Sequence, residues 1–266
     1  MDPKLCRQLN LFSLELLADY LSVDFITIKE IYDELLSDTF FLEELNEQIS
    51  TNRRFYQGGI FKHKYLDSID WFAIQRIILY VIVRLFKPEI CLETGVFYGG
   101  STCFILNALR RNKKGTLISI DLPGQIWENK LNIDRHHMVG HSEDIPKGLD
   151  IGFIVHKNLK EHLQLIEGNS LEEIPKINKT IDMYNHDSEH SFGFVKQEMG
   201  LVWDKLAKNS LIIADDIDWS NGFFSFCVEK KLYPLIITDN GKSGLRARNG
   251  LIQLAHPFNQ KKDVVG

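Results

Sequence analysis

The feature that most constrains the fold is a regular alternation of short apolar runs and helical stretches that begins at Ser68. Strand-like runs occupy residues 89–93, 115–121, 163–168, 180–187 and 210–216, and two closing runs occupy residues 233–241 and 249–255. Helices are expected at 101–111 and 190–208. Because strands separated by helices favour parallel pairing, the sequence predicts an α/β fold with a Rossmann-like, doubly wound, mostly parallel seven-stranded sheet.

The first 66 residues have a different pattern of apolar residues. Segments 11–21, 26–36 and 40–49 carry apolar residues at helical spacing, without a strong strand signal. We therefore predict a helical N-terminal cap over residues 1–66 and a ligand-binding domain over residues 67–266. A buried helix is expected at 69–86, with Ser68 as its N-cap and Pro88 after its end.

Polar residues stand at the end of one predicted strand after another. They are Glu93 and Gly95, then Asp121, then Glu167, Gly168 and Asn169, then Asp187, and last Asp215 and Asp216. A single acid here is most simply a turn former or a helix cap. Five strand ends in succession favour a ligand site instead, because ligands bind beyond the carboxyl ends of parallel strands.

The stretch LETGVFYGGST, residues 92–102, forms the first of these strand ends. It lacks the lysine of a nucleoside-triphosphate loop, and its glycines do not have dinucleotide-binding spacing. Asp121, one strand away, suits ribose hydroxyls. A ligand with a cationic amino-acid end suits these acids better than a pyrophosphate does, and S-adenosylmethionine is such a ligand.

ETGVFYGGST resembles motif I of the class I S-adenosylmethionine-dependent methyltransferases. More narrowly, residues 68–255 resemble the metal-dependent O-methyltransferases of the catechol and caffeoyl-CoA type and the macrocin-type natural-product group. The resemblance implies that Glu93, Gly95 and Ser101 line the methionine end of the cofactor and that Asp121 binds its ribose. It places Gly168, Asn169 and Ser170 by the adenine. The remaining expected cofactor-binding residues are Phe97, Gly99 and Asp187.

The same resemblance implies a metal site. In metal-dependent members an aspartate ends the fourth strand and an acidic pair ends the fifth, which here are Asp187, Asp215 and Asp216. Neighbouring strands lie about 4.8 Å apart, so the three carboxylates are expected to converge on one divalent cation. Oxygen ligands suit Mg²⁺, which lowers the pKa of an acceptor oxygen and orients it. The implied activity is Mg²⁺-assisted O-methyl transfer to a hydroxylated sugar, phenol or natural product.

His190 is the candidate general base, acting beside Asp187, because an imidazole accepts a proton near neutral pH. The catechol-type enzymes have a lysine at this offset, whereas the macrocin-type group has an Asp-Gly-Asp-His arrangement to which DSEH is similar. The alternative is that His190 only caps the helix that it opens.

The sequence leaves two alternative functions. HDSEH matches the H-x-x-E-H signature of zinc peptidases through His186, Glu189 and His190, but that signature belongs on a helix and a strand-like run precedes it here. A non-catalytic, regulatory S-adenosylmethionine-binding protein of the same fold is the other alternative. The intact acids at residues 187, 215 and 216 argue against it.

The remaining expectations concern partners and surroundings. With 31 basic and 36 acidic residues the net charge is −5, which argues against nucleic acid as a partner. The N-terminus lacks a signal-peptide pattern and the most apolar segment, 71–86, is too short to span a bilayer, so we expect a cytoplasmic protein without a membrane partner. Whether it forms a homo-oligomer stays open.

The sequence also predicts where three groups of side chains lie. The cysteines, expected to be reduced and buried, are Cys6, Cys91, Cys103 and Cys227. The aromatic residues expected to pack inside the cap, rather than form a lid or a dimer face, are Phe40, Phe41, Phe55 and Tyr56. The histidines expected at the surface or in a substrate lid, within the long loop 122–151, are His136, His137 and His141.

Overall fold

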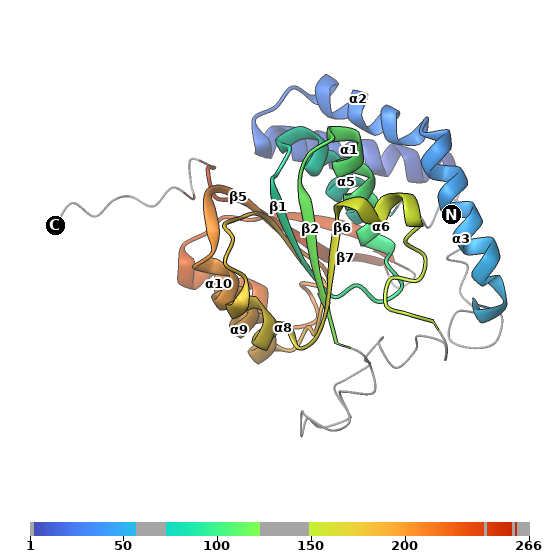
Figure 1. The fold of residues 1–266 in the computed structure, drawn as a ribbon. Coiled ribbons are helices and arrows are strands. Elements are labelled where there is room, and N and C mark those ends of the chain that lie inside the picture. Colours follow the sequence, from blue (N-terminus) through green and yellow to red (C-terminus); the bar gives the residue numbers. More distant parts are fainter. Residues whose placement is uncertain (1–2, 57–72, 123–148, 242–243, 257–258, 260–266) are drawn as a thin grey trace.

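The sheet has seven strands in the order β3-β2-β1-β4-β5-β7-β6 (Figure 1). This computed structural model describes residues 3–56, 73–122, 149–241, 244–256 and 259. The strands are β1 (Ile90–Thr94), β2 (Thr116–Asp121), β3 (Leu163–Glu167), β4 (Ile181–His186), β5 (Leu206–Ala214), β6 (Leu235–Gly241) and β7 (Gly244–Gln253). The first five pair in parallel, whereas β7 runs antiparallel to both β5 and β6. The predicted doubly wound sheet is confirmed.

The strand order places a switch point at the middle of the sheet. From β1 the chain moves outward through β2 to β3, and then returns to β4 on the other side of β1. The connections on the two sides of β1 therefore diverge, and in folds of this kind ligands bind at such a switch point, here the carboxyl ends of β1 and β4. Thr94 pairs with His186 at these ends.

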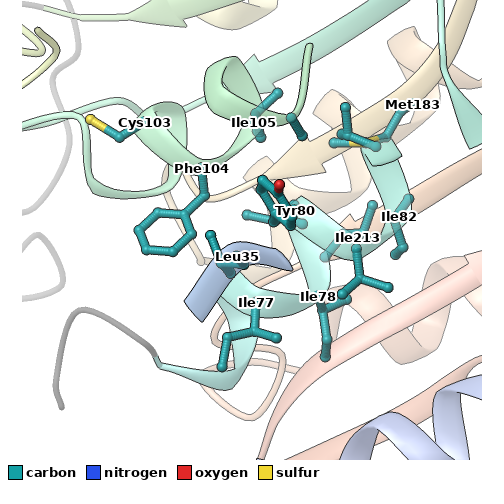
Figure 2. Packing of buried hydrophobic residues seen from close by; sticks show 14 of the residues in the cluster. Leu35, Ile77, Ile78, Tyr80, Ile82, Cys103, Phe104, Ile105, Met183 and Ile213 are labelled. Carbon is teal, nitrogen blue, oxygen red and sulfur yellow. The ribbon is translucent and has the colours of Figure 1, made fainter. Parts of the chain in front are cut away.

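Alternation along the strands supplies two apolar cores, one on each face. Leu211 and Ile213 of β5 point into the first core, whereas Ile212 and Ala214 point into the second. The first core packs against α5 (Ile74–Phe86) and α6 (Gly100–Asn112), and Figure 2 shows residues of α5 and α6 meeting Ile213 of the sheet. The second core includes residues of α9 (Phe192–Trp203) and α10 (Gly222–Lys230), together with Ile174, which directly follows α8 (Ser170–Glu173).

The N-terminal residues fold into α1 (Pro3–Leu21), α2 (Phe25–Leu36) and α3 (Thr39–Tyr56), on the α5 and α6 side of the sheet (Figure 1). Their buried side chains, including Leu35 and Phe41, belong to the same core as α5 and α6. A bidentate ion pair joins Glu34 to Arg84, with nitrogen-to-oxygen distances of 2.8 and 2.9 Å. The predicted boundary between residues 66 and 67 lies outside the described residues.

Two expectations about helices need correction. The helix expected at 190–208 begins at Phe192 and ends at Trp203, and Leu206 opens β5, paired with Ile181. Leu206 fits a helical stripe by spacing, but the Lys205 N–H bonds to the Val202 carbonyl and ends the helix. The second correction is α10, which the sequence interpretation missed entirely. The start of the helix expected at 69 lies outside the described residues.

Most of the remaining structural expectations hold where the structure describes them. Cys91, Cys103 and Cys227 are buried free thiols. Phe41 is fully buried as expected, but Phe40 is 55% exposed and lies under the Arg110 guanidinium, so its assignment to the core is wrong. None of the helices in the described part of the chain is long and apolar enough to cross a membrane. The expectations for the remaining residues fall outside the part of the chain that the structure describes. They concern His136, His137 and His141 and the side chains of Cys6, Phe55 and Tyr56.

Candidate functional site

The turn between β1 and α6, residues 95–99, passes directly over the end of β4. Gly95 has φ +83°, and a Cβ there would lie 1.9 Å from the backbone oxygen of Asp187. Its N–H donates to the Ile120 carbonyl of β2 at 2.9 Å. Only glycine combines this conformation with this approach. The glycine turn therefore joins the ends of β1, β2 and β4.

Asp121, at the end of β2, holds this turn in place. Its Oδ2 accepts the backbone N–H groups of Val96 at 2.9 Å and Phe97 at 2.6 Å, and its Oδ1 accepts that of Leu122 at 2.7 Å. Burial raises the pKa of this carboxyl, and the three N–H groups oppose the rise. An ionised carboxylate has about four acceptor sites, so capacity remains for a ligand hydroxyl.

Glu93 of β1 lies beneath the turn and is fully buried. Its Oε2 accepts the hydroxyls of Thr102 at 2.8 Å and Ser119 at 2.7 Å. Burial raises the pKa of Glu93 to about 7, although both hydroxyls lower it. The Glu93 side chain thus connects the first turn of α6 to the middle of β2, and none of it is exposed to solvent.

Buried polar atoms without well-formed hydrogen bonds gather beside Glu93. Among the described residues, Glu93 Oε1 and both amide atoms of Asn185 lack a well-formed hydrogen bond, although the Asn185 amide is near enough to Glu93 to lower the pKa of its carboxyl. Asn185 of β4 is fully buried and is the register partner of Glu93. Such atoms are rare in proteins and indicate a missing polar partner. The sequence interpretation overlooked Asn185, which stands among the other polar residues of β4, Asp182 and His186.

The other predicted cofactor residues lie along the same edge. The Gly168 N–H donates to the Asp121 carbonyl at 2.8 Å, which ties the end of β3 to the end of β2. Asn169 caps α8 by accepting the Leu171 N–H at 3.0 Å, and Ser170 follows it. Gly99 is the N-cap of α6, and Ser101 lies in the first turn of that helix. The structure therefore brings the predicted residues of β1, β2 and β3 to one edge.

The three predicted metal ligands, Asp187, Asp215 and Asp216, form what we call the acid cluster. Asp187 donates its N–H to the Thr94 carbonyl at 2.9 Å, and Asp215 donates its N–H to the His186 carbonyl at 2.9 Å. Burial, and then the charges of Asp215 and Asp216, raise the pKa of Asp187 well above its usual value. The carboxylates are therefore close enough to repel one another.

Two residues of β7 contact the acid cluster, and the sequence interpretation did not anticipate either. Arg248 Nε lies 3.4 Å from Asp215 Oδ1 and 3.1 Å from Asp216 Oδ1. The Asn249 amide donates to Asp215 Oδ1 at 2.6 Å. Carboxylate oxygens are the donors that suit Mg²⁺. In the described residues, however, no group of three acidic, histidine or cysteine side chains is arranged to hold a metal ion.

A small pocket opens beside the acid cluster. Its lining includes His186, His190, Asp215, Asp216, Ser220 and Phe223. The His190 ring lies 5.6 Å from the His186 ring and 6.2 Å from the Trp219 ring, measured between centroids. The N-cap of α9 is Ser191, so His190 precedes the helix and the capping interpretation is wrong. His190 instead lines the pocket together with the acids.

His186, which also lines this pocket, contacts a buried acid. Its Nδ1 lies 3.4 Å from Glu198 Oε2, and Glu198 is fully buried in α9. Burial raises the pKa of Glu198, but His186 and the Ser188 hydroxyl outweigh it and the pKa is lowered. His186 is the last residue of β4, and the helix begins only at Phe192. The zinc peptidase interpretation is therefore wrong, since both histidines must share one helix.

The chain is similar to known proteins in part of its sequence and in its fold. Residues 92–217 match a family model described as a methyltransferase domain. A search of curated proteins finds no match. The fold is similar to an O-methyltransferase from Bacillus cereus in complex with SAH, with 13% identity, a TM-score of 0.55, and coverage of 79% of this chain and 90% of that one.

Two further structures share the fold. TomG of Streptomyces achromogenes, an O-methyltransferase of tomaymycin synthesis in complex with SAM, has 14% identity and a TM-score of 0.53, covering 79% of this chain and 89% of its own. CalS11, a calicheamicin methyltransferase, has 14% identity and a TM-score of 0.50, covering 79% and 92%. At these identities the likeness establishes the fold, which agrees with the sheet order described above.

Proposed function

From the premise that residues 92–217 form a methyltransferase domain, we propose that this chain transfers a methyl group from S-adenosylmethionine to a hydroxyl of a small molecule. The observation that carries the proposal is the glycine turn. It is held in place by Asp121 and approaches the end of β4 at Asp187, and the buried register partners Glu93 and Asn185 lie at the ends of β1 and β4 beside it. A polar ligand with a cationic end fits this edge.

The residues present fit the cofactor. Asp187 offers carboxylate oxygens at the switch point for an ammonium group, and the buried Glu93 and Asn185 lie at the strand ends beside it. Asp121 keeps acceptor capacity for ribose hydroxyls, and residues 168–170 follow β3 next to it. When bound, the cofactor supplies a methyl group on a positively charged sulfur, which leaves as a neutral thioether. The acids along this edge favour that cation in the ground state.

We infer that a divalent cation, for which Mg²⁺ is the natural choice, would have to draw the carboxylates of the acid cluster together, because they are not arranged around an ion in this structure. The oxygen-only donors of Asp187, Asp215 and Asp216 support this assignment, and their strands β4 and β5 are paired neighbours. When bound, the ion supplies Lewis acidity that lowers the pKa of an acceptor hydroxyl. In the structure Arg248 meets two of these three carboxylates.

His190 is the proposed acceptor of the proton that the hydroxyl loses. It lines the same pocket as Asp215 and Asp216, so an acceptor oxygen held there comes within reach of its imidazole. The proton passes to an imidazole nitrogen as the oxygen gains the methyl group. Phe223 and Val195 give the pocket apolar walls and Ser220 adds a hydroxyl, a lining that suits a sugar, a phenol or another hydroxylated natural product.

Labelled methyl transfer tests this function. Wild-type protein is incubated with methyl-labelled S-adenosylmethionine, Mg²⁺ and panels of sugars, phenols and hydroxylated natural products. We expect a labelled methyl ether whose formation stops in Asp187→Asn. Cofactor binding without labelled product from any panel would instead favour the regulatory, non-catalytic alternative.

A further inference from the structure

We propose that Glu44 of α3 is a positioning residue for cofactor binding. Through His156 and Asn158 it holds residues 151–158, which we call the backing segment, against the glycine turn. The inference rests on the cofactor site of the proposed function and deepens it. It makes a residue of the N-terminal helices contribute to cofactor affinity from outside the strand ends.

The backing segment is bonded to the carbonyl groups of the glycine turn. The Gly152 N–H donates to the Phe97 carbonyl at 2.7 Å, and the Ile154 N–H donates to the Tyr98 carbonyl at 3.1 Å. Asp121 of β2 accepts N–H groups of the same turn. The turn is therefore held through its N–H groups by β2 and through its carbonyl groups by the backing segment.

The backbone of the glycine turn needs this support. Gly99 has φ +98°, and a Cβ there would lie 2.6 Å from a Val155 methyl carbon and 3.1 Å from the Gly152 Cα. Phe97 has φ +51°, a sparsely populated conformation for a residue with a side chain. Such conformations persist only where the surrounding structure fixes them. A shift of the backing segment would let the turn relax away from the shape that we propose binds the cofactor.

Glu44 fastens the backing segment from a buried position. Its side chain is 4% exposed, and its Oε1 accepts the Asn158 side-chain amide at 3.0 Å. Its two oxygens also accept Arg110 Nη1 of α6, at 3.0 and 2.8 Å. Leaving a buried donor or acceptor unpaired costs free energy, so these hydrogen bonds favour one arrangement of the three side chains. Glu44 thus joins α6, which directly follows the glycine turn, to the backing segment.

His156 completes the connection between α3 and the backing segment. It is 5% exposed, and its Nδ1 accepts the Asn158 backbone N–H at 3.3 Å, so the proton of the neutral ring is on Nε2. Nε2 lies 3.4 Å from Glu47 Oε2, and Nδ1 lies 3.3 Å from Glu44 Oε1. The ring therefore lies between two carboxylates that are one turn of α3 apart. His156 directly follows Val155, which packs against the glycine turn.

Calorimetric titration with S-adenosylmethionine tests this role of Glu44. Glu44→Gln keeps the size of the side chain and removes its charge and one acceptor oxygen. It should weaken cofactor binding at least about fivefold, the usual effect of losing one such hydrogen bond. His156→Asn is the second variant, because asparagine can still accept the Asn158 N–H but is too short to reach Glu47. It should weaken cofactor binding in the same direction.

Glu34→Gln is the matched control. Glu34 also joins the N-terminal helices to the rest of the chain, but its partners Arg84 and Tyr80 lie on α5. Both glutamine variants should lower the melting temperature, because each leaves an arginine without its carboxylate. Only Glu44→Gln should weaken cofactor binding. A merely structural role for Glu44 would give the same result in both variants.

Hydrogen exchange gives a second measurement that does not depend on a variant being folded. Coupling between two sites is reciprocal, so S-adenosylmethionine should slow amide exchange in α3 of the wild type. Exchange in β6 serves as the internal reference. In Glu44→Gln this protection of α3 should be lost.

Equal cofactor affinity in wild type, Glu44→Gln and His156→Asn would overturn the proposal, as would an equal loss of affinity in Glu34→Gln. Unchanged exchange in α3 of the cofactor-bound wild type would overturn it as well. These outcomes, with normal binding by wild type, remove only the role of Glu44. Failure of folded wild type to bind S-adenosylmethionine would contradict the proposed function itself, and this inference with it.

Discussion

The carboxylate of Asp121 accepts the backbone N–H of Phe97 at 2.6 Å, and so the end of β2 fixes the turn that follows β1. Phe97 has a φ of +51°, a conformation that few non-glycine residues adopt. The hydrogen bond to Asp121 is the evident support for this conformation. Asp121 therefore shapes this turn and also lies at the edge where we propose that the cofactor binds.

Asp121→Asn should weaken S-adenosylmethionine binding by about 1 to 3 kcal/mol, since the amide replaces one acceptor oxygen with a donor. Calorimetric titration measures the change. Asp182→Asn is the matched control, because the Asp182 carboxylate also accepts two backbone N–H groups, those of Glu89 and Ile90, at the opposite edge of the sheet. Equal losses in both variants would point to general destabilisation and not to a ligand contact.

Glu93→Gln should change how stability depends on pH. Burial raises the pKa of Glu93 from 4.5 to about 7 in the folded protein. Between these values the folded state binds a proton that the unfolded state releases, so wild-type stability falls as pH rises through this window. The loss is about 3 kcal/mol and is complete above pH 7. Urea unfolding at pH 5 and pH 8 should show this decline in wild type, reduced in the Gln variant; parallel profiles would refute it.

His190→Asn should fold normally, bind the cofactor, and lose at least about a hundredfold in rate, the typical contribution of a general base. The wild-type rate should rise with pH as the imidazole loses its proton. His256→Asn is the control, because His256 stacks on Tyr20 away from the pocket and its loss should leave the rate alone. Near-normal turnover in His190→Asn would leave proton removal to another group.

Removal of divalent metal by a chelator should abolish turnover and leave cofactor binding largely in place. The acid cluster lies at the ends of β4 and β5, whereas Asp121 lies at the end of β2. Asp216→Asn should raise the Mg²⁺ concentration needed for half-maximal rate. Rates are measured across a Mg²⁺ titration after chelator is removed. A metal-free preparation that turns over at full rate would show that the acids act without an ion.

The N-terminal helices should contribute to the stability of the whole chain. Phe41→Ala empties a fully buried position that meets Phe104 edge to face, and should cost about 3 to 5 kcal/mol in the free energy of unfolding. Phe40→Ala, one residue away but 55% exposed, should cost less than about 1 kcal/mol. Urea unfolding of the two variants compares them directly. Similar small losses would mean that the helices fold apart from the sheet.

Sequence reasoning located the strands because their apolar runs end in turn residues and acids. β1, β2 and β4 were placed within a residue or two, and the parallel order then brought Glu93, Asp121 and Asp187 to one edge without any tertiary information. The pairing of β4 with β5 similarly brought Asp215 beside Asp187.

What the sequence interpretation missed depends on long-range contacts. Arg248 and Asn249 reach the acid cluster only because β7 pairs antiparallel with β5. No local sequence pattern predicts that these two strands are neighbours. Glu198 looks like a surface acid on a helix, yet it is fully buried against His186. The end of α9 was misjudged because Leu206 continues a helical stripe as well as it opens a strand.

Calorimetric titration with S-adenosylmethionine tests the central claim most directly, using wild type, Gly95→Ala and Gly193→Ala. A Cβ at Gly95 would collide with the Asp187 carbonyl, whereas one at Gly193 in α9 meets nothing within 4 Å. We predict one binding site in wild type and in Gly193→Ala, and at least about tenfold weaker binding in Gly95→Ala. No binding by folded wild type, or equal affinity in all three proteins, would contradict a cofactor site at the glycine turn.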